Sequence, residues 1–519
     1  MKIPFAFILL LAVGCSSSQQ TMGENQQSVI TPNDPERFAA SITEPELSEH
    51  LYIYASDAFE GRETGQPGQK KAVEYIIDQY KALGIPAVKS DGDYKQTVPL
   101  ETNGVPEGSI TINGNRLIVG SEVLTFTEAK GIYNEVVYVG YGIEDENYSD
   151  YDGIDVSGKI LLAKSGEPRN ADGTYRVSGT TEKSDWSNMS ESMGKRTALA
   201  IEKGAKGVLY FDPQNYARYN RFFNFMKGNK SGRMGLKADK TDAFVILLNN
   251  QAVTTLLPDI LDNSAARVIP AQVKLDVSSA GNTIDSENIA AILKGTSKPD
   301  EYVVISSHLD HIGMTEDGRI NNGADDDGSG TVALFEIAEA FKKAKDDGKG
   351  PARSIVFLHV TGEEKGLLGS RYYTDFEPLV PLEQTVANLN IDMIGRIDPK
   401  RTGDRNYIYL IGSDKLSTEL HELSEAVNTK YTQIELDYTY NDENDPNRFY
   451  YRSDHYNFAK NNIPIIFYFN GTHADYHRPT DTPDKINYDL LKNRTQLIFH
   501  TAWEVANRET KVAVDKAIE

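Results

Sequence analysis

Hydrophobic positions follow different periods in three successive parts of the chain. In KKAVEYIIDQYKALGI, residues 70–85, apolar side chains recur at helical spacing from Val73 to Leu83, and Gly84 follows as a stop signal. Residues 40 to 85 are therefore predicted to be largely helical. From about 105 to 283, short β-type runs alternate with turns. We expect strands at SITINGNRLIV, EVVYVGYGI, KILLAKSG, GVLYF and AFVILL, and one helix at SMGKRTALAIEKGA.

The pattern changes again after residue 287, where continuous apolar runs alternate with helical segments. The runs are NIAAILKG, EYVVISSH, RSIVFLHVTG, TVANLNID and IPIIFYFN, and TVALFEIAEAFKKA is the clearest helix. Strands that are apolar on both faces indicate a largely parallel sheet covered by helices on both sides. The sequence thus predicts one α/β domain built from residues 40–105 and 285–519. Residues 106–284 are predicted to form a smaller inserted α/β domain.

The N-terminus is typical of an exported protein. An apolar run from Ile3 to Val13 follows Lys2; it is too short to span a bilayer but suits a secretory signal peptide. Cys15, after LAVG, stands where bacterial lipoprotein signals carry their lipidated cysteine, although Ala12 replaces the usual leucine. We expect a signal peptide at 1–15, a flexible tether at 16–39, and a cell-envelope lipoprotein in the periplasm or outer membrane. A plain secretory signal with an incidental cysteine is the alternative.

Composition and charge narrow the function classes. The 519 residues include 39% hydrophobic and 25% charged residues, which is ordinary for a globular protein. A net charge of -22 disfavours binding to nucleic acid or to anionic membranes. The single cysteine excludes internal disulfides and cysteine-built zinc sites, so any metal site must use histidine and carboxylate ligands.

Such ligands follow the predicted strands. Ligands of open α/β sheets bind beyond the carboxyl ends of the strands, and each of four apolar strands is followed there by acidic residues or histidines. These residues are His308 and Asp310, Glu363 and Glu364, Asp392, and the group His473, Asp475 and His477. The common polarity predicts that they gather at one edge of the sheet.

NNGADDDGSG, residues 321–330, lies between the first of these strands and the next helix. Three adjacent aspartates could form a solvated turn, a calcium loop, or a ligand that bridges two metal ions. Calcium-loop spacing is present from Asp325 to Glu336, but no helix precedes it and Glu336 falls inside an apolar-patterned helix. A bridging carboxylate fits better, because two divalent ions offset the repulsion between neighbours. Histidine and carboxylate donors without cysteine suit zinc in an open, water-binding site.

Five motifs in this order resemble the co-catalytic dizinc exopeptidases, a family that includes bacterial leucyl aminopeptidases and, more distantly, glutamate carboxypeptidase. They are SHLDHIG, GADDDGSG, TGEEKGLLGS, NLNIDMIGR and DYHRPTDTPDKI. The resemblance covers about residues 287–510 and implies a three-layer α/β zinc-peptidase domain with a mixed, largely parallel central sheet. The inserted domain resembles a protease-associated (PA) domain through YGIEDENYSDYDGIDVSGKILL and KRTALAIEKGAKGVLYF.

The resemblance also implies a role for each site residue. Two zinc ions would be held by His308, Asp326, Glu364, Asp392 and His477, with Asp326 as the bridge. Glu363 would be the general base, and Asp310 would orient His308 by accepting its other ring proton. Tyr450, four residues before Asp454, would stabilise the oxyanion, with the adjacent Tyr451 as a rival. Family members can flank this tyrosine with a disulfide, which this chain cannot form.

The function expected from this resemblance is that of a metal-dependent exopeptidase, foremost an aminopeptidase that hydrolyses N-terminal residues of peptides with a dizinc-activated water. Alternatives are a carboxypeptidase or dipeptidase, then a one-zinc glutaminyl cyclase, then a non-catalytic peptide-binding lipoprotein. Arginines that could bind a substrate carboxylate lie near the motifs: Arg396, Arg448, Arg452 and Arg478. Peptides are the expected partners, with no nucleic acid, no obligate protein partner, and membrane contact only through Cys15. We expect His311, His473, Asp325 and Asp327 to support the site rather than bind metal, and the inserted domain to roof it.

Overall fold

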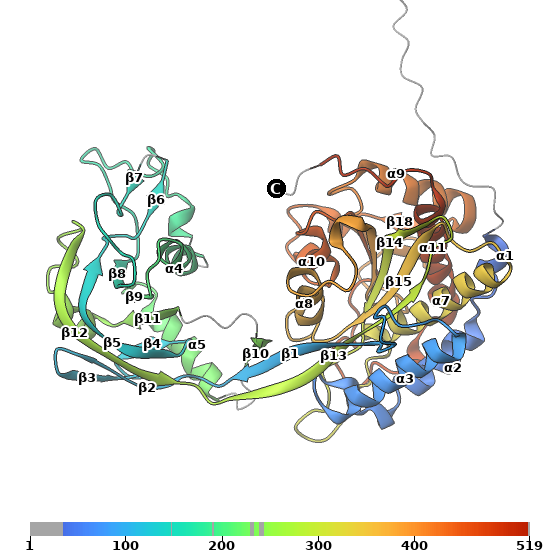
Figure 1. Ribbon diagram of the computed structural model, residues 1–519, viewed down its shortest axis with the longest axis horizontal. Helices are drawn as coiled ribbons and strands as arrows, with labels where there is room; N and C mark the ends of the chain where they lie inside the picture. Colours follow the sequence, from blue (N-terminus) through green and yellow to red (C-terminus); the bar gives the residue numbers. More distant parts are fainter. Residues whose placement is uncertain (1–34, 147, 189–190, 229–232, 238–242, 517–519) are drawn as a thin grey trace, which may run out of the picture.

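The computed structural model describes residues 35–146, 148–188, 191–228, 233–237 and 243–516. The predicted signal peptide at 1–15 and most of the predicted tether lie outside these residues. None of the described helices combines the length and the apolar character that a membrane span requires. Two sheets organise the chain into two bodies, and the long strands β1 (Lys95–Asn103) and β13 (Gly281–Leu293) run between them (Figure 1).

The first body is built on a nine-stranded mixed sheet. Its strands, in spatial order, are β10 (Arg233–Leu236), β1, β13, β15 (Arg353–Val360), β14 (Lys298–His308), β16 (Thr385–Ile391), β19 (Ile465–Phe469), β17 (Tyr407–Ile411) and β18 (Glu435–Asp437). The four central strands β15, β14, β16 and β19 are mutually parallel. The pairings on either side of this centre, β13 with β15 and β17 with β19, are antiparallel. The predicted α/β class with a mixed sheet is confirmed.

Helices cover both faces of this sheet, as the continuous apolar strands predicted. They are α1 (Glu36–Ala39), α2 (Glu44–Tyr54), α3 (Pro67–Leu83), α7 (Gly330–Asp346), α8 (Leu368–Asp375), α9 (Thr418–Val427), α10 (His455–Ala459) and α11 (Tyr488–Asn507). Successive side chains of a strand point to opposite faces. Ile355 and Phe357 of β15 therefore pack with α3, α7 and α11, whereas Val356 and Leu358 pack with α8 and α10. The result is three layers.

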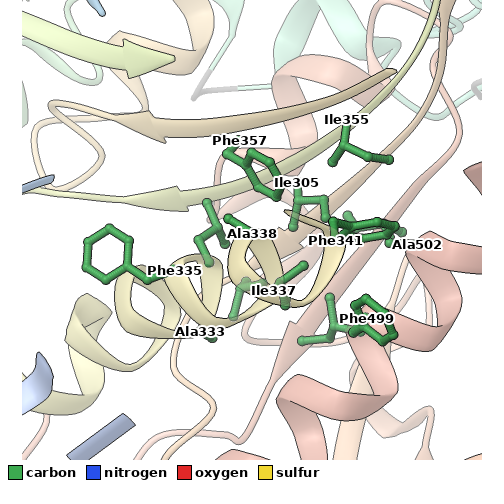
Figure 2. Close-up of a cluster of buried hydrophobic side chains, with 14 of the residues drawn as sticks. Ile305, Ala333, Phe335, Ile337, Ala338, Phe341, Ile355, Phe357, Phe499 and Ala502 are labelled. Atoms are coloured by element: carbon green, nitrogen blue, oxygen red, sulfur yellow. The ribbon is translucent and has the colours of Figure 1, made fainter. Parts of the chain in front are cut away.

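Helix α7 occupies the centre of the larger core. Figure 2 shows Ile337, Ala338 and Phe341 of α7 among side chains of β14, β15 and α11. The ring of Phe341 lies 4.9 Å from that of Phe499. Because α7 begins directly after the aspartate loop, this packing fixes the loop to a rigid element. The helix predicted at 331–344 and the stop at Gly84, which adopts φ 67°, are both confirmed.

The predicted tether ends earlier than residue 39. Residues 36–39 form α1, and Phe38 and Ala39 are buried. The ring of Phe38 stacks on Trp503 of α11 with centroids 5.9 Å apart. This short segment belongs to the first body, because burying Phe38 outweighs the polar character of the residues around it.

The second body has its own sheet and its own core. The eight strands, in spatial order, are β3 (Asn115–Ile118), β2 (Glu107–Ile112), β12 (Arg267–Ser278), β5 (Ala129–Tyr138), β8 (Ile160–Lys164), β9 (Gly207–Phe211), β11 (Phe244–Leu248) and β4 (Val123–Thr125). Helices α4 (Ser192–Glu202), α5 (Tyr216–Gly228) and α6 (Asn250–Leu256) accompany them, with a small hairpin of β6 (Glu144–Asp145) and β7 (Tyr148–Ser149). All five predicted strand runs and the predicted helix are present.

One strand of the predicted insert contributes to the other body. β10 pairs with β1, and its Leu236 packs with Val98, Leu100 and Leu368. The chain between 106 and 284 is therefore not a single independent unit. The insert leaves the first sheet at the edge where the parallel strands end, because Ser286 Oγ of β13 lies 2.6 Å from Thr361 Oγ1, just after β15.

Candidate metal centre and active site

The aspartate loop (η4, Ala324–Ser329) uses its outer two aspartates to hold backbone. The amides of Gly330 and Met393 donate to Asp327 Oδ1 at 2.9 and 3.1 Å, and the amide of His308 donates to Oδ2 at 3.1 Å. Asp325 Oδ1 accepts the amide of Gly395 at 2.7 Å. These carboxylates are thus committed to the loop, as expected, and do not form a calcium loop.

The frame of this loop depends on a buried arginine and on glycine. Arg62, 1% exposed, donates to the carbonyls of Asn322 at 2.7 Å and Gly323 at 2.8 Å. Gly323 has φ 56°, and a Cβ atom there would collide with the carbonyl of Asp326. A Cβ at Gly330 would collide with the carboxylate of Asp327. Glycine therefore permits the close approach that leaves the middle aspartate exposed to the site.

Asp326 lies between two groups of potential ligands. On one side, His308 Nε2 is 3.2 Å from Asp326 Oδ1 and 3.6 Å from Asp392 Oδ1. On the other side, His477 Nε2 is 3.1 Å from both Asp326 Oδ2 and Glu364 Oε2. The five residues predicted to hold two metals are therefore brought together from five separate segments of the chain, with Asp326 shared.

Several polar atoms at this place have no hydrogen-bond partner among the described residues. They are His308 Nε2, both ring nitrogens of His311, Asp326 Oδ2 and Glu364 Oε1. Leaving buried polar atoms unpaired is costly, and lone pairs converging from imidazoles and carboxylates are the donor set of a transition-metal site. The residues present thus fit a pair of metal ions.

The closely packed carboxylates and imidazoles shift one another's pKa values. Burial alone would raise the pKa of Asp326, but His311, His308 and His477 hold it well below its usual range. Burial would lower the pKa of His477, but the adjacent carboxylates of Asp326 and Glu364 raise it to about 10. Metal ions and protons compete for these donor atoms, so metal binding releases protons from the histidines.

Asp310 supports the site differently from the prediction. His308 Nδ1 lies 3.0 Å from the backbone carbonyl of Asp310 but 4.0 Å from its carboxylate. The carboxylate instead accepts the amide of Glu363 at 3.2 Å and the hydroxyl of Thr64 at 2.7 Å. The main chain of Asp310 thus orients the imidazole, and its side chain orients the residue predicted to be the base. Spacing along the sequence could not distinguish these two acceptors.

Glu363 lines a small hollow beside the two groups of potential metal ligands and belongs to neither group. Burial, together with the nearby carboxylates of Asp392 and Glu364 and against the opposing effect of His308, raises its pKa well above the usual value. Apolar and acidic residues share the wall of this hollow. They are Asp326, Glu363, Asp392, Met393, Phe449, Arg452, Phe467, Phe469, Thr472 and Tyr476.

Tyr450, the predicted oxyanion residue, does not line this hollow, and neither does Tyr451. The Tyr450 ring packs close to Gly412, and burial with Tyr451, Tyr456 and Asp414 nearby raises its pKa to about 12. Tyr476 lines the hollow instead. Its ring stacks on His477 with centroids 3.9 Å apart. Burial is the largest cause that raises the pKa of Tyr476, and the nearby carboxylates, Asp326 and Glu364 first among them, raise it further. The position of Tyr450 four residues before Asp454 favoured Tyr450 in the sequence, whereas in the structure Tyr476 lines the hollow.

His311 lies closer to the potential metal ligands than the supporting role expected from the sequence implies. It is fully buried, and its Nδ1 lies 2.8 Å from Glu364 Oε1 and 3.7 Å from Asp326 Oδ2. His311, Asp326 and Glu364 form a group that could hold a metal ion. The position of His311 three residues after His308 was the available signal. His473, in contrast, supports the loop, because its Nε2 lies 3.1 Å from Asp325 Oδ2.

Comparison with known proteins agrees with this geometry. Residues 288–502 match the profile of Peptidase family M28. The "Probable glutamate carboxypeptidase LAMP1" of Arabidopsis thaliana is 31% identical over 159 residues, 30% of this chain and 21% of the relative. "Aminopeptidase YwaD" of Bacillus subtilis is 27% identical over 233 residues, 44% of this chain and 46% of the relative. The chain thus spans less than half the length of these curated relatives.

A solved structure also resembles the chain along most of its length. The zinc aminopeptidase BSAP from Bacillus subtilis aligns at 18% identity over 92% of this chain and 98% of the other, with a TM-score of 0.46. The matched family segment contains His308, Asp326, Glu364, Asp392 and His477. The similarity to Peptidase family M28 thus covers residues 288–502, the part of the chain that carries the candidate metal ligands.

Proposed function

We propose that this chain is a zinc-dependent exopeptidase that removes N-terminal residues from peptides. The observation that carries the proposal is the sharing of Asp326 between two histidine–carboxylate groups, with the uncommitted Glu363 beside them. A single metal would need only one such group, and a binding protein would need no basic carboxylate in the same hollow.

The donors divide between two ions. His308 and Asp392 would hold one ion and Glu364 and His477 the other, with Asp326 bridging and His311 close to the second. When bound, the two ions would lower the pKa of a shared water and polarise the scissile carbonyl. The histidine and carboxylate donors suit zinc. A relative with an aminopeptidase name supports the peptidase assignment.

The side chains around the ions supply the remaining chemistry. Glu363 would take a proton from the attacking water and return it to the leaving amine, and Asp310 holds its backbone in place. The Tyr476 hydroxyl would donate a hydrogen bond to the oxygen on which negative charge develops. The apolar wall of Met393, Phe449 and Phe467 would hold the side chain of the departing residue, and the acidic residues would attract its free amine.

A carboxypeptidase is the second candidate, because Arg452 also lines the hollow. Two of the other arginines near the motifs make different contacts. Arg396 pairs with Asp475 at 3.0 Å, and Arg448 lies over the ring of Tyr451. One arginine against several carboxylates favours recognition of an amine.

Hydrolysis of one tripeptide, blocked in turn at its N- and C-terminus, tests this proposal. An aminopeptidase cuts only the peptide with a free N-terminus, and Glu363→Gln abolishes cutting. Cutting of the N-blocked peptide alone would reverse the polarity and make Arg452 the anchor. A zinc count near two excludes a one-zinc cyclase, and absence of cutting with zinc bound would refute the peptidase proposal.

We further propose that the protein is exported and anchored through a lipid on Cys15, with peptides as its partners. The apolar run and the cysteine support this. The insert, which we propose is a PA domain, leaves the sheet at the edge that carries the site (Figure 1). That origin supports a role in limiting access, which cleavage rates for peptides of increasing length would test.

A further inference from the structure

A second group of carboxylates lies between α2 and α7, outside the site described above. Glu46 belongs to α2, and Glu336 and Glu339 belong to α7. Oxygens of these three side chains lie within 4.8 Å of one another. His50, one turn after Glu46, places its Nε2 4.0 Å from Glu336 Oε1. We call these residues the α2–α7 cluster.

Glu336 is the unusual member of the cluster. Its side chain is 3% exposed, and its Oε2 has no hydrogen-bond partner among the described residues. Burial, followed by the charges of Glu46 and Glu339, raises its pKa to about 8. A buried, ionised carboxylate surrounded by acidic groups is unfavourable unless a proton or a metal cation compensates its charge.

The available basic groups do not supply that compensation. Lys343 pairs with Glu339 at 2.9 Å, so with all three carboxylates ionised these four side chains would carry two net negative charges. The Tyr75 hydroxyl lies 2.8 Å from His50 Nδ1, on the side of the ring away from Glu336. Glu46 accepts a hydrogen bond from the hydroxyl of Thr43 at 2.6 Å, so its position is fixed without being neutralised. One divalent ion would replace the proton on Glu336 and neutralise the three ionised carboxylates.

We propose that Glu46, Glu336 and Glu339 bind one calcium ion between α2 and α7. Carboxylate oxygens are the ligands that calcium prefers, at 2.3–2.6 Å, so oxygens up to about 5 Å apart can share one ion. Glu336 takes part here through tertiary packing and not through the loop spacing that begins at Asp325, whose carboxylate is committed to backbone and to His473.

The ion would connect two elements that carry the catalytic loop. The Tyr54 hydroxyl of α2 donates to the carbonyl of Leu309 at 2.9 Å, next to His308. A Cβ atom at Gly328 would lie 2.8 Å from Leu51 of α2, which shows how closely this helix packs under the loop. Helix α7 starts at Gly330, at the other end of the loop. Calcium would therefore stabilise the scaffold of the site without taking part in the chemistry.

Thermal unfolding of the zinc-loaded protein, with and without millimolar calcium chloride, tests this proposal. Zinc loading keeps calcium from the catalytic residues. We expect calcium to raise the Tm of the wild type by about 3 °C or more. Glu336→Gln should lose this shift while retaining its fold in calcium-free buffer. Equilibrium dialysis should find one calcium ion per chain in the wild type and none in this variant.

Glu49→Gln is the matched control, since Glu49 is an exposed residue of the same helix and not a cluster member. This variant should keep the full shift. An unchanged Tm in the wild type would overturn the proposal. So would an equal shift in Glu336→Gln, which would place calcium elsewhere, or an equal loss in Glu49→Gln, which would reduce the effect to general surface charge.

Discussion

Exchange of single tyrosine hydroxyls distinguishes the two candidates for oxyanion stabilisation. Tyr476→Phe keeps the ring that stacks on His477 at 3.9 Å, so the change removes one hydrogen-bond donor and leaves the packing. A tyrosine hydroxyl is protonated at neutral pH and able to donate, and the raised pKa of Tyr476 leaves that state unchanged. Tyr450→Phe is the matched control, because that hydroxyl lies outside the hollow.

The magnitude follows from the number of donors removed. Loss of one oxyanion donor typically lowers kcat by about 10²–10³, equivalent to about 2.7–4 kcal/mol of transition-state stabilisation. We expect Tyr476→Phe to lower kcat by about 10², the smaller value, because Arg452 in the same hollow can partly compensate. KM should change little, since the ring remains in place. Tyr450→Phe should change kcat less than twofold.

The assay is steady-state hydrolysis of an N-terminally free tripeptide, with zinc content and unfolding measured for each variant. Equal zinc content ensures that a lower kcat reflects chemistry. A fall of about 10² in Tyr450→Phe with near-normal Tyr476→Phe would refute the reasoning, and would restore the assignment that the motif offset suggested.

Four further outcomes follow from the structure. Glu363→Gln should lower kcat by about 10²–10⁴ while the protein still holds two zinc ions, as measured by metal analysis. Arg62→Ala should lower the free energy of unfolding in urea by about 3 kcal/mol, because two short hydrogen bonds from a buried guanidinium are lost, whereas a loss below about 1 kcal/mol would contradict its role. The pKa of Glu336 in the folded protein is raised to about 8. Without calcium, its protonation therefore stabilises the fold fully below about pH 4.5, and this stabilisation is lost as the pH rises towards 8. The free energy of unfolding in urea should show this decline for the wild type and lack it for Glu336→Gln. Cys15→Ala should move the protein from the membrane fraction to the soluble fraction, and an unchanged distribution would exclude a lipid anchor.

Local patterns predicted the central parallel strands and helix α7, but gave no prediction for several elements, among them β12, α5 and the long helix α11. The strand runs at 159–166, 207–211 and 353–362 correspond to β8, β9 and β15, because each contains four consecutive apolar residues close to turn residues. The predicted tether was too long, since the burial of Phe38 against Trp503 depends on a helix more than 450 residues away in sequence. β10 was missed because four residues carry no clear period until β1 provides a partner.

The sequence by itself was enough to identify the residues that meet at the candidate site. Parallel strands deliver their carboxyl ends to one edge, so ordered motifs at those ends were sufficient to bring His308, Asp326 and Glu364 together. Only the tertiary structure decided between neighbouring groups of similar type. It placed Tyr476 rather than Tyr450 in the hollow, turned the carbonyl rather than the carboxylate of Asp310 towards His308, and brought Glu336 to Glu46. These choices depend on side-chain directions and on contacts between distant segments, which no local period encodes.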